Sequence, residues 1–146
     1  EIVLVTGVQT CALPIFRAYA LDPENPMIKL SIGLGYVHHG LKRQSENRQF
    51  QIMQGLTFLL DYYKCRRASD KAEERQEASY NVARTYQMVG LSHLALPYYQ
   101  EILDDARSSA TKEDLVLDAA FNLQTMYSMS GNMRMADYIT TTWLQK

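Results

Sequence analysis

The histidines and cysteines are the side chains best suited to metal or redox chemistry, and their spacing does not form a metal site. His38 and His39 are adjacent, while His93, Cys11 and Cys65 stand apart, with no Cys or carboxylate at ligand spacing. The His pair precedes a glycine, which is typical of the C-terminal end of a helix, where positive charge suits the helix dipole. We therefore expect no metal and no cofactor. The lack of a CxxC pair indicates a reducing compartment rather than a disulfide framework.

Catalytic motifs are the next chemistry to consider, and the sequence contains none of the common ones. It has no G-x-S-x-G, P-loop, H-E-x-x-H or G-x-G-x-x-G pattern. The short G-x-G at Gly33 and Gly35 lies inside a helical pattern without a third glycine at the required spacing. Helix packing is the favoured interpretation of these glycines. We expect no catalytic residue and no enzyme activity.

A basic run at Lys64–Arg67, followed by Lys71 and Arg75, is the best candidate for a patch that binds nucleic acid or an acidic partner. Three carboxylates interrupt it, namely Asp70, Glu73 and Glu74. A solvated connector is therefore favoured, and the pairs Glu73–Glu74 and Asp104–Asp105 are likewise interpreted as solvated faces. The net charge of −1 gives no electrostatic reason for tight nucleic-acid binding, which needs clustered Lys and Arg.

The composition favours packed helices. The 146 residues are 47% hydrophobic and 21% charged, with ten Tyr and seven Met against four Pro and seven Gly, which is few turn residues for a β-sandwich. This length suits one domain with a modest core. No apolar run reaches the roughly 18 residues that span a bilayer, so we expect no membrane segment.

Hydrophobic periodicity predicts helices almost throughout. The segment Arg17–Leu21 is interpreted as the end of a helix, and Asp22–Pro26 as a turn, because proline removes a donor and disfavours a helical residue before it. Further helices are expected at about 27–41, 46–65, 72–89, 91–109, 112–130 and 133–145. In the second of these, a stripe at spacings of three and four is predicted to be buried, comprising Phe50, Met53, Leu56, Leu60 and Tyr63.

Three positions within or between these helices have specific expectations. Gly90 and Gly131 fall between helices, where a left-handed residue closes a turn at little cost. Pro97 falls in the second turn of a helix, where one lost hydrogen bond and a mild kink are expected. We expect Trp143 to pack the last helix onto its partner.

The first sixteen residues differ from the rest. Residues 5–15 suggest a short β-like run followed by a loop, and their eleven residues are identical to the translated end of a widely used short-read sequencing adapter. The hypothesis is that residues 1–16 are a non-native, adapter-derived segment, that residues 17–146 form the native repeat domain, and that the natural protein is longer at its N-terminus. The alternative is a genuine N-terminal strand or arm.

The chain contains an internal repeat with a spacing of 41 residues. The segment Tyr80–Ala83 corresponds to Phe121–Gln124, and the following Tyr, Gly and Ala of the two copies correspond as well. A weaker third copy begins at Ile32. The pattern resembles the tetratricopeptide consensus, with small residues where two helices meet and aromatic residues between repeats, although Gln124 departs from it.

This resemblance implies an all-α fold of tetratricopeptide-like helical hairpins stacked as a short superhelical solenoid. The residues assigned to repeat packing are Gly33, Tyr36, Gly40, Ala83, Tyr86, Gly90, Ala95, Tyr99, Tyr127, Gly131 and Ala136. The usual repeat has 34 residues, and we expect the additional residues around 108–114.

Three longer runs carry a more specific resemblance: Gln54–Tyr63, Glu77–Arg84 and Val89–Tyr99. Together with Leu30–Tyr36, Ala120–Gln124 and Ser130–Ala136, they resemble the C-terminal repeats of the tetratricopeptide subunit of general transcription factor IIIC (the third subunit, or the largest tau-A subunit in yeasts). The resemblance covers Arg17 to Trp143. It implies a nuclear, non-catalytic scaffold in RNA polymerase III transcription initiation.

The same resemblance implies the partners. They are other subunits of transcription factor IIIC, with factor IIIB contacted through N-terminal repeats that this chain lacks. No direct sequence-specific DNA binding is expected, and no membrane association.

A generic tetratricopeptide adaptor or co-chaperone is the alternative. Such adaptors clamp a terminal carboxylate with basic and Asn side chains. Asn81 and Asn122 match the Asn position, but Glu77 and Asp118 are acidic where the clamp needs Lys. The clamp is therefore incomplete.

Overall fold

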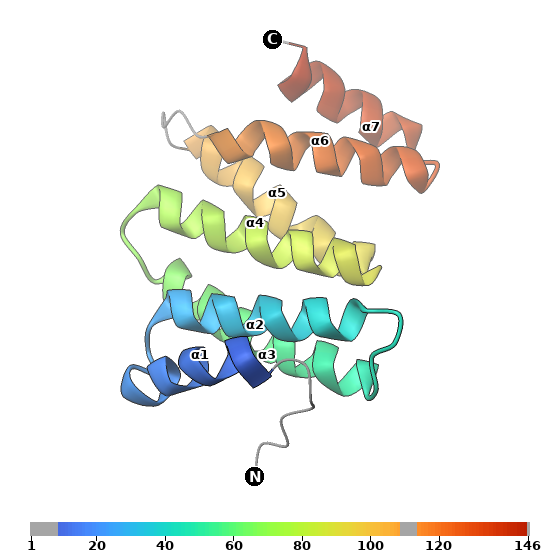
Figure 1. Cartoon of the computed structure of the whole chain (residues 1–146). Coiled ribbons are helices and arrows are strands. Elements are labelled where there is room, and N and C mark those ends of the chain that lie inside the picture. Colours follow the sequence, from blue (N-terminus) through green and yellow to red (C-terminus); the bar gives the residue numbers. More distant parts are fainter. Residues whose placement is uncertain (1–8, 109–113, 146) are drawn as a thin grey trace. The chain divides into compact units, whose positions relative to one another are not determined.

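The computed structural model describes residues 9–108 and 114–145, and in these ranges the chain is helical apart from short turns (Figure 1). It divides into two compact units, residues 1–65 and 66–146. The first contains α1 (Gln9–Leu21), α2 (Pro26–Leu41) and nearly all of α3 (Arg48–Arg67). The second contains α4 (Ala72–Val89), α5 (Ser92–Ser108), α6 (Asp114–Met129), α7 (Met133–Ile139) and a π-helical turn (Thr140–Leu144). The predicted all-α class of tetratricopeptide-like hairpins is confirmed, and residues 109–113, where we expected additional repeat residues, lie outside the described ranges.

Helix α1 begins earlier than the sequence suggested. The β-like run and loop expected for residues 5–15 are wrong for residues 9–15, which are helical, while residues 5–8 lie outside the described residues. The C-terminal half of α1 docks on α2 and α3: Phe16 lies edge-on to Tyr36 with ring centroids 6.2 Å apart, and Tyr19 lies edge-on to Phe58 at 5.5 Å. Residues 9–15 extend this docked helix toward the N-terminus. Docking on α2 and α3 outweighs local β propensity. The adapter-derived origin of residues 1–16 stays a hypothesis.

Helix α2 begins and ends as its sequence predicts. Asn25 caps it by accepting a hydrogen bond from the Met27 amide at 3.0 Å, and Pro26 occupies the first helical position, where a missing N–H costs nothing. His38 and His39 lie in its last turn. The turn between α1 and α2 therefore has the local chemistry that was expected of residues 22–26.

Helices α2 and α3 make a close contact through two glycines. A Cβ atom on Gly55 would lie 2.6 Å from Val37 Cγ2 and 2.7 Å from the Gly33 carbonyl oxygen, while one on Gly33 would lie 2.7 Å from Leu59 Cγ. Only hydrogen fits at these two positions. Gly35 differs, because nothing lies within 4 Å of its would-be Cβ. The helix-packing interpretation of the G-x-G therefore holds for Gly33 and is wrong for Gly35.

The buried face of α3 agrees only in part with the predicted stripe. Phe50 and Met53 are 59% and 62% exposed. Leu56 is buried as predicted, and Leu60 and Tyr63 are half-buried. The other buried residues of α3 are Gly55, Leu59 and Tyr62. Residues 56–63 are apolar almost all round, so spacings of three and four fit several faces equally well. The glycine contact, which the periodicity did not take into account, decides which face turns inward.

The second unit is built around small and aromatic side chains of successive helices. Helix α4 is capped at its C-terminal end by Gly90 (φ +87°) and α6 is followed by Gly131 (φ +79°), which confirms the two left-handed turns. The fully buried apolar residues described in this unit are Ala78, Val82, Ala83, Ala95, Tyr99, Ile102, Leu103, Ala119, Ala120, Leu123, Ala136 and Ile139. Pro97 lies inside α5 and is exposed, so its ring does not enter this core.

The predicted last helix changes character at Thr140, where the α-helix becomes a π-helical turn. Three consecutive threonines occupy this point, and the hydroxyls of Thr140 and Thr141 donate to the carbonyls of Ala136 and Asp137, each at 2.9 Å. Such bonds compete with the regular backbone ladder. The Trp143 ring contacts the guanidinium of Arg107 on α5, 5.5 Å from the ring centroid.

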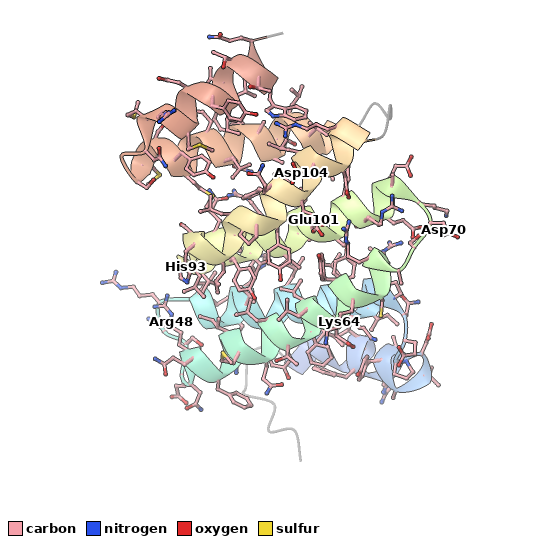
Figure 2. The ribbon with its side chains drawn as sticks, turned by 180° about the vertical axis from the view of Figure 1, so that it is seen from behind. Arg48, Lys64, Asp70, His93, Glu101 and Asp104 are labelled. Carbon is pink, nitrogen blue, oxygen red and sulfur yellow. The ribbon has the colours of Figure 1, made fainter. Side chains whose placement is uncertain are left out.

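The basic run is held largely by ion pairs within the second unit. Helix α3 continues to Arg67, whose guanidinium bridges Glu101 (2.7 Å) and Asp105 (2.9 Å) of α5. Arg66 pairs with Glu74 of α4 at 3.0 Å. Figure 2 shows Glu101 midway along α5, one turn before Asp104. The interpretation of this run as a solvated connector is wrong for both arginines, whose side chains are 16% and 27% exposed.

In each of the two acidic pairs, Glu73–Glu74 and Asp104–Asp105, one residue is solvated as expected and the other forms an ion pair. Glu73 and Asp104 are exposed, as expected of solvated faces. Glu74 and Asp105 are half-buried in ion pairs. The Ser79 hydroxyl donates to Glu101 at 2.7 Å, so the same cluster also joins the middle of α4 to α5.

Replacing Gly55 by Ala is expected to destabilise the chain by about 1–3 kcal/mol, because the added methyl group meets backbone atoms of α2 that cannot move aside cheaply. The matched control is Gly35→Ala, which meets nothing and is expected to gain about 0.5–1 kcal/mol from helix propensity. Urea unfolding followed by circular dichroism measures both free energies of unfolding. Equal effects of the two substitutions would contradict the close glycine contact.

The carboxyl group of Glu74 makes the free energy of unfolding depend on pH in the acid range. The Ser69 hydroxyl and then the ion pairs with Arg66 and Lys71 lower its pKa from 4.5 to about 2. A pKa lowered by folding contributes stability above about pH 4.5, and this contribution is lost as the pH falls toward 2.

Glu74→Gln is therefore expected to flatten the loss of stability between about pH 5 and 2. Glu73→Gln, at an exposed neighbour in the same turn, is the control and should keep the wild-type profile. Thermal midpoints measured across this range test the idea. A wild-type acid profile for Glu74→Gln counts against it.

Candidate functional site: the face shared by α4 and α6

Helices α4 and α6 contact each other and carry equivalent positions of the 41-residue repeat. Polar side chains of α6 and of α5 each form a hydrogen bond to α4. The Asn122 amide of α6 donates to the Tyr80 hydroxyl of α4 at 3.4 Å, and the Tyr99 hydroxyl of α5 donates to Gln87 Oε1 of α4 at 2.9 Å. Arg84 donates to the same Gln87 oxygen at 3.1 Å. Two successive hairpins are therefore held in register by hydrogen bonds as well as by apolar packing.

Tyr99 is the central residue of this network. Its side chain is fully buried, and its ring lies edge-on to Tyr80 with centroids 5.9 Å apart. Burial raises the pKa of Tyr99, and the neighbouring Tyr80 raises it further. The hydroxyl therefore stays protonated at neutral pH and acts as a hydrogen-bond donor. Nearby, burial also raises the pKa of Tyr86 and of Tyr98, whose rings stack at 5.8 Å.

The residues assigned to repeat packing lie in three environments. Seven are buried: Gly33, Gly40, Ala83, Tyr86, Ala95, Tyr99 and Ala136. Tyr36 and Tyr127 are half-buried, and Gly90 and Gly131 are exposed at their turns. The structure brings Ala83, Tyr86, Ala95 and Tyr99 together in the hairpin of α4 and α5. Their role in packing one repeat on the next stays a prediction.

Sequence reasoning missed a buried lysine in the first unit. The Lys29 side chain is 3% exposed, and its ammonium pairs with Asp61 at 2.8 Å and Glu24 at 3.2 Å. It also donates to the Cys65 sulfur at 3.5 Å. The hydrogen bond to Asp61 raises the pKa of Lys29 despite its burial, so the group stays charged. A lysine among apolar residues of a helix is the only sequence signal of this cluster, and it does not identify the partners.

Gly55 is a second residue that was missed as a packing position. A glycine in the middle of a helix costs about 1 kcal/mol relative to Ala, so its presence there indicates close approach of another element. The arginine cluster around Arg67 was missed for a different reason. Its partner Asp105 lies 38 residues away, and nothing local connects the two.

Other kinds of site have no support in the parts of the chain that the structure describes. In these parts, no group of three or more His, Cys, Asp or Glu comes together as a metal site. The same residues include no helix that is long and apolar enough to cross a membrane. Of the candidate clamp residues, Asn122 is engaged with Tyr80 within the protein.

Helix α6 also has large apolar side chains that are exposed to solvent. Leu117 and Phe121, one turn apart, are 58% and 60% exposed, and the exposed carboxylate of Asp118 lies between them in the sequence. We call Leu117, Asp118 and Phe121 the α6 face. It combines two large apolar side chains with a negative charge, which suits contact with another protein.

Three curated proteins are similar to the chain over most of its length. It is 39% identical to "Transcription factor tau subunit sfc4" of Schizosaccharomyces pombe, with 88% of the chain covered. It is 34% identical to "Transcription factor tau 131 kDa subunit" of Saccharomyces cerevisiae, with 84% covered, and 32% identical to "General transcription factor 3C polypeptide 3" of Homo sapiens, with 87% covered. No protein-family model matches the chain.

These relatives are much longer than the chain, which spans only 12–14% of their lengths. Identity of 32–39% over about 85% of the chain agrees with the three runs that resembled the tetratricopeptide subunit. The chain therefore belongs to the family of this transcription factor IIIC subunit, the third subunit, and matches a segment of it.

Proposed function

We propose that the chain is a non-catalytic protein-binding scaffold within a transcription factor IIIC subunit that acts in RNA polymerase III transcription initiation. The observation that carries this proposal is the 32–39% identity to three transcription factor subunits over most of the chain. A repeat of helical hairpins suits the role, because stacked hairpins present an extended surface while each contacts only its neighbours.

The environments of the reactive side chains support a non-catalytic role. General acid–base catalysis needs a titratable group that reaches the substrate. Lys29 is instead buried against Asp61 and Glu24, and Tyr99 is buried against Gln87. Arg67 and Glu101 form an ion pair within the second unit. The charged and hydroxyl groups with the most perturbed surroundings thus hold helices together.

In this proposal the partners are other subunits of transcription factor IIIC, and the protein acts in the nucleus. Contact with factor IIIB is assigned to N-terminal repeats outside this chain. Direct sequence-specific DNA binding is not assigned to it, because Arg66 and Arg67 are engaged by Glu74, Glu101 and Asp105. No enzyme activity and no membrane association are assigned.

The test is recovery of partners by the tagged chain from nuclear extract of Schizosaccharomyces pombe, the source of the relative with 39% identity. Quantitative mass spectrometry is expected to show transcription factor IIIC subunits enriched over an untagged control. Recovery of chaperones alone would instead support the generic adaptor and contradict the proposal.

Tyr99→Ala is the matched control for folding. Truncation of this fully buried aromatic side chain is expected to cost about 3–5 kcal/mol and to disrupt the hairpin of α4 and α5. It should therefore abolish recovery of the subunits. Unchanged recovery would mean that binding does not use the folded repeats.

A further inference from the structure

Two serines of the chain follow a pair of basic residues at the same spacing. Residues 42–45 have the sequence Lys-Arg-Gln-Ser, and residues 66–69 have the sequence Arg-Arg-Ala-Ser. Serine kinases that select basic substrates bind such a pair of cations with carboxylates in their substrate cleft. By sequence alone, both Ser45 and Ser69 therefore qualify as phosphorylation sites, and accessibility decides between them.

The segment 66–69 is engaged in contacts within the second unit. Its two arginines lie in the last turn of α3 and form ion pairs with carboxylates of that unit. Ser69 is held as well. Its hydroxyl is hydrogen-bonded to Glu74 and accepts from the Lys71 amide at 3.2 Å, while its carbonyl accepts from Arg75 at 2.8 Å. A kinase can bind this segment only after these contacts have opened.

The segment 42–45 lies instead in the turn that joins two helices of the first unit. Helix α2 ends at Leu41 and α3 begins at Arg48, and Lys42 already has an extended backbone (φ −64°, ψ 139°). Lys42 and Arg43 are exposed, and neither forms an ion pair with another described residue. Both cations are therefore available to the carboxylates of a kinase.

The Ser45 hydroxyl is held by local contacts alone. Its side chain is half-buried, and among the described residues its hydroxyl donates to the carbonyl of the neighbouring Glu46, at 3.2 Å. One backbone hydrogen bond, from the Ser45 amide to the Lys42 carbonyl at 3.1 Å, closes the turn. The segment can therefore extend into a kinase cleft by giving up two local hydrogen bonds, without opening a helix.

We propose that Ser45 is a phosphorylation site for a serine kinase that recognises basic residues before the serine, and that the fold makes Ser69 inaccessible to the same kinase. The Ser45 oxygen attacks the γ-phosphorus of Mg²⁺-bound ATP in the kinase, the bond from that phosphorus to the oxygen bridging it to the β-phosphorus breaks, and ADP leaves. The hydroxyl proton passes to a carboxylate base of the kinase. This inference is independent of the proposed function.

Phosphorylation changes the charge of the turn. The exposed charged side chains there are the three cations Lys42, Arg43 and Arg48 and the carboxylate Glu46, a net charge of +2. A phosphoserine carries about −1.5 to −2 charge at neutral pH, so the modified turn is nearly neutral. Because Ser45 precedes the first residue of α3 by three positions, the positive end of this helix also favours the phosphate.

The proposal is tested by incubating the tagged full chain with Mg-ATP and the purified catalytic subunit of cyclic-AMP-dependent protein kinase, which selects basic substrates. Mass spectrometry locates the phosphate and gives initial rates. Ser45 is expected to be modified at least about ten times faster than Ser69, because the ion pairs before Ser69 must first open. Unstructured synthetic peptides of residues 40–50 and 64–74 are the control, and in them the Ser69 sequence is expected to react at least as fast.

The basic pair is tested by Arg43→Ala, which is expected to lower the rate at Ser45 about tenfold. The matched control is Lys64→Ala, at an exposed cation near the other end of α3 from Arg48 (Figure 2), and it should keep the wild-type rate. Circular dichroism checks that both variants keep their helices.

The same chain is also incubated with Mg-ATP in the nuclear extract of Schizosaccharomyces pombe, where kinases of the cell are expected to place phosphate at Ser45. Absence of phosphate at Ser45 in either incubation overturns the proposal. Modification of Ser69 in the folded chain as fast as Ser45, or a rate at Ser45 indifferent to Arg43→Ala, overturns it as well.

Discussion

The close approach of paired helices is the constraint on which the hairpins depend, and the side chains at the crossing decide whether it is possible. In the first unit, Gly33 and Gly55 allow the backbones of α2 and α3 to meet, and a single Cβ at Gly55 would lie 2.7 Å from a carbonyl oxygen. In the second unit, the fully buried Ala83 and Ala95 occupy α4 and α5. Small residues at the crossing let the larger ones interdigitate beside it, because helix spacing depends on the side chains in contact. The crossing also determines which face of each helix turns inward.

The close approach of paired helices explains which predictions from the sequence succeeded and which did not. Helix identity and turn positions followed from local chemistry, such as the Asn25 cap and the positive φ of Gly90 and Gly131, and local chemistry is visible in a sequence. The buried face of α3 was predicted only in part, because the apolar residues around Leu56 permit several stripes and Gly33 of α2 selects one. Residues 9–15 were misassigned because local β propensity is weak and depends on context, and here they extend the helix that contains Tyr19.

Electrostatics were the least predictable part of the candidate site, for a related reason. The runs of like charge suggested solvated faces or a basic patch, but Arg66 and Arg67 contact carboxylates on two other helices. A half-buried guanidinium needs such partners, since an unpaired charge there is costly. These ion pairs lie within the second unit, so the most basic segment contributes to the architecture of that unit. The same logic applies to Lys29, whose charge Asp61 holds inside the first unit.

Exposure alone does not define a binding surface, and the internal repeat supplies the missing comparison. Phe50 on α3 is as exposed as Phe121 on α6, and isolated exposed apolar residues are ordinary. Phe121 differs because its counterpart, Tyr80, contacts a neighbouring helix in the same structure. The chain thus contains both a covered and an uncovered version of one surface. In a stacked repeat, the open side of one hairpin is the side on which the next hairpin packs.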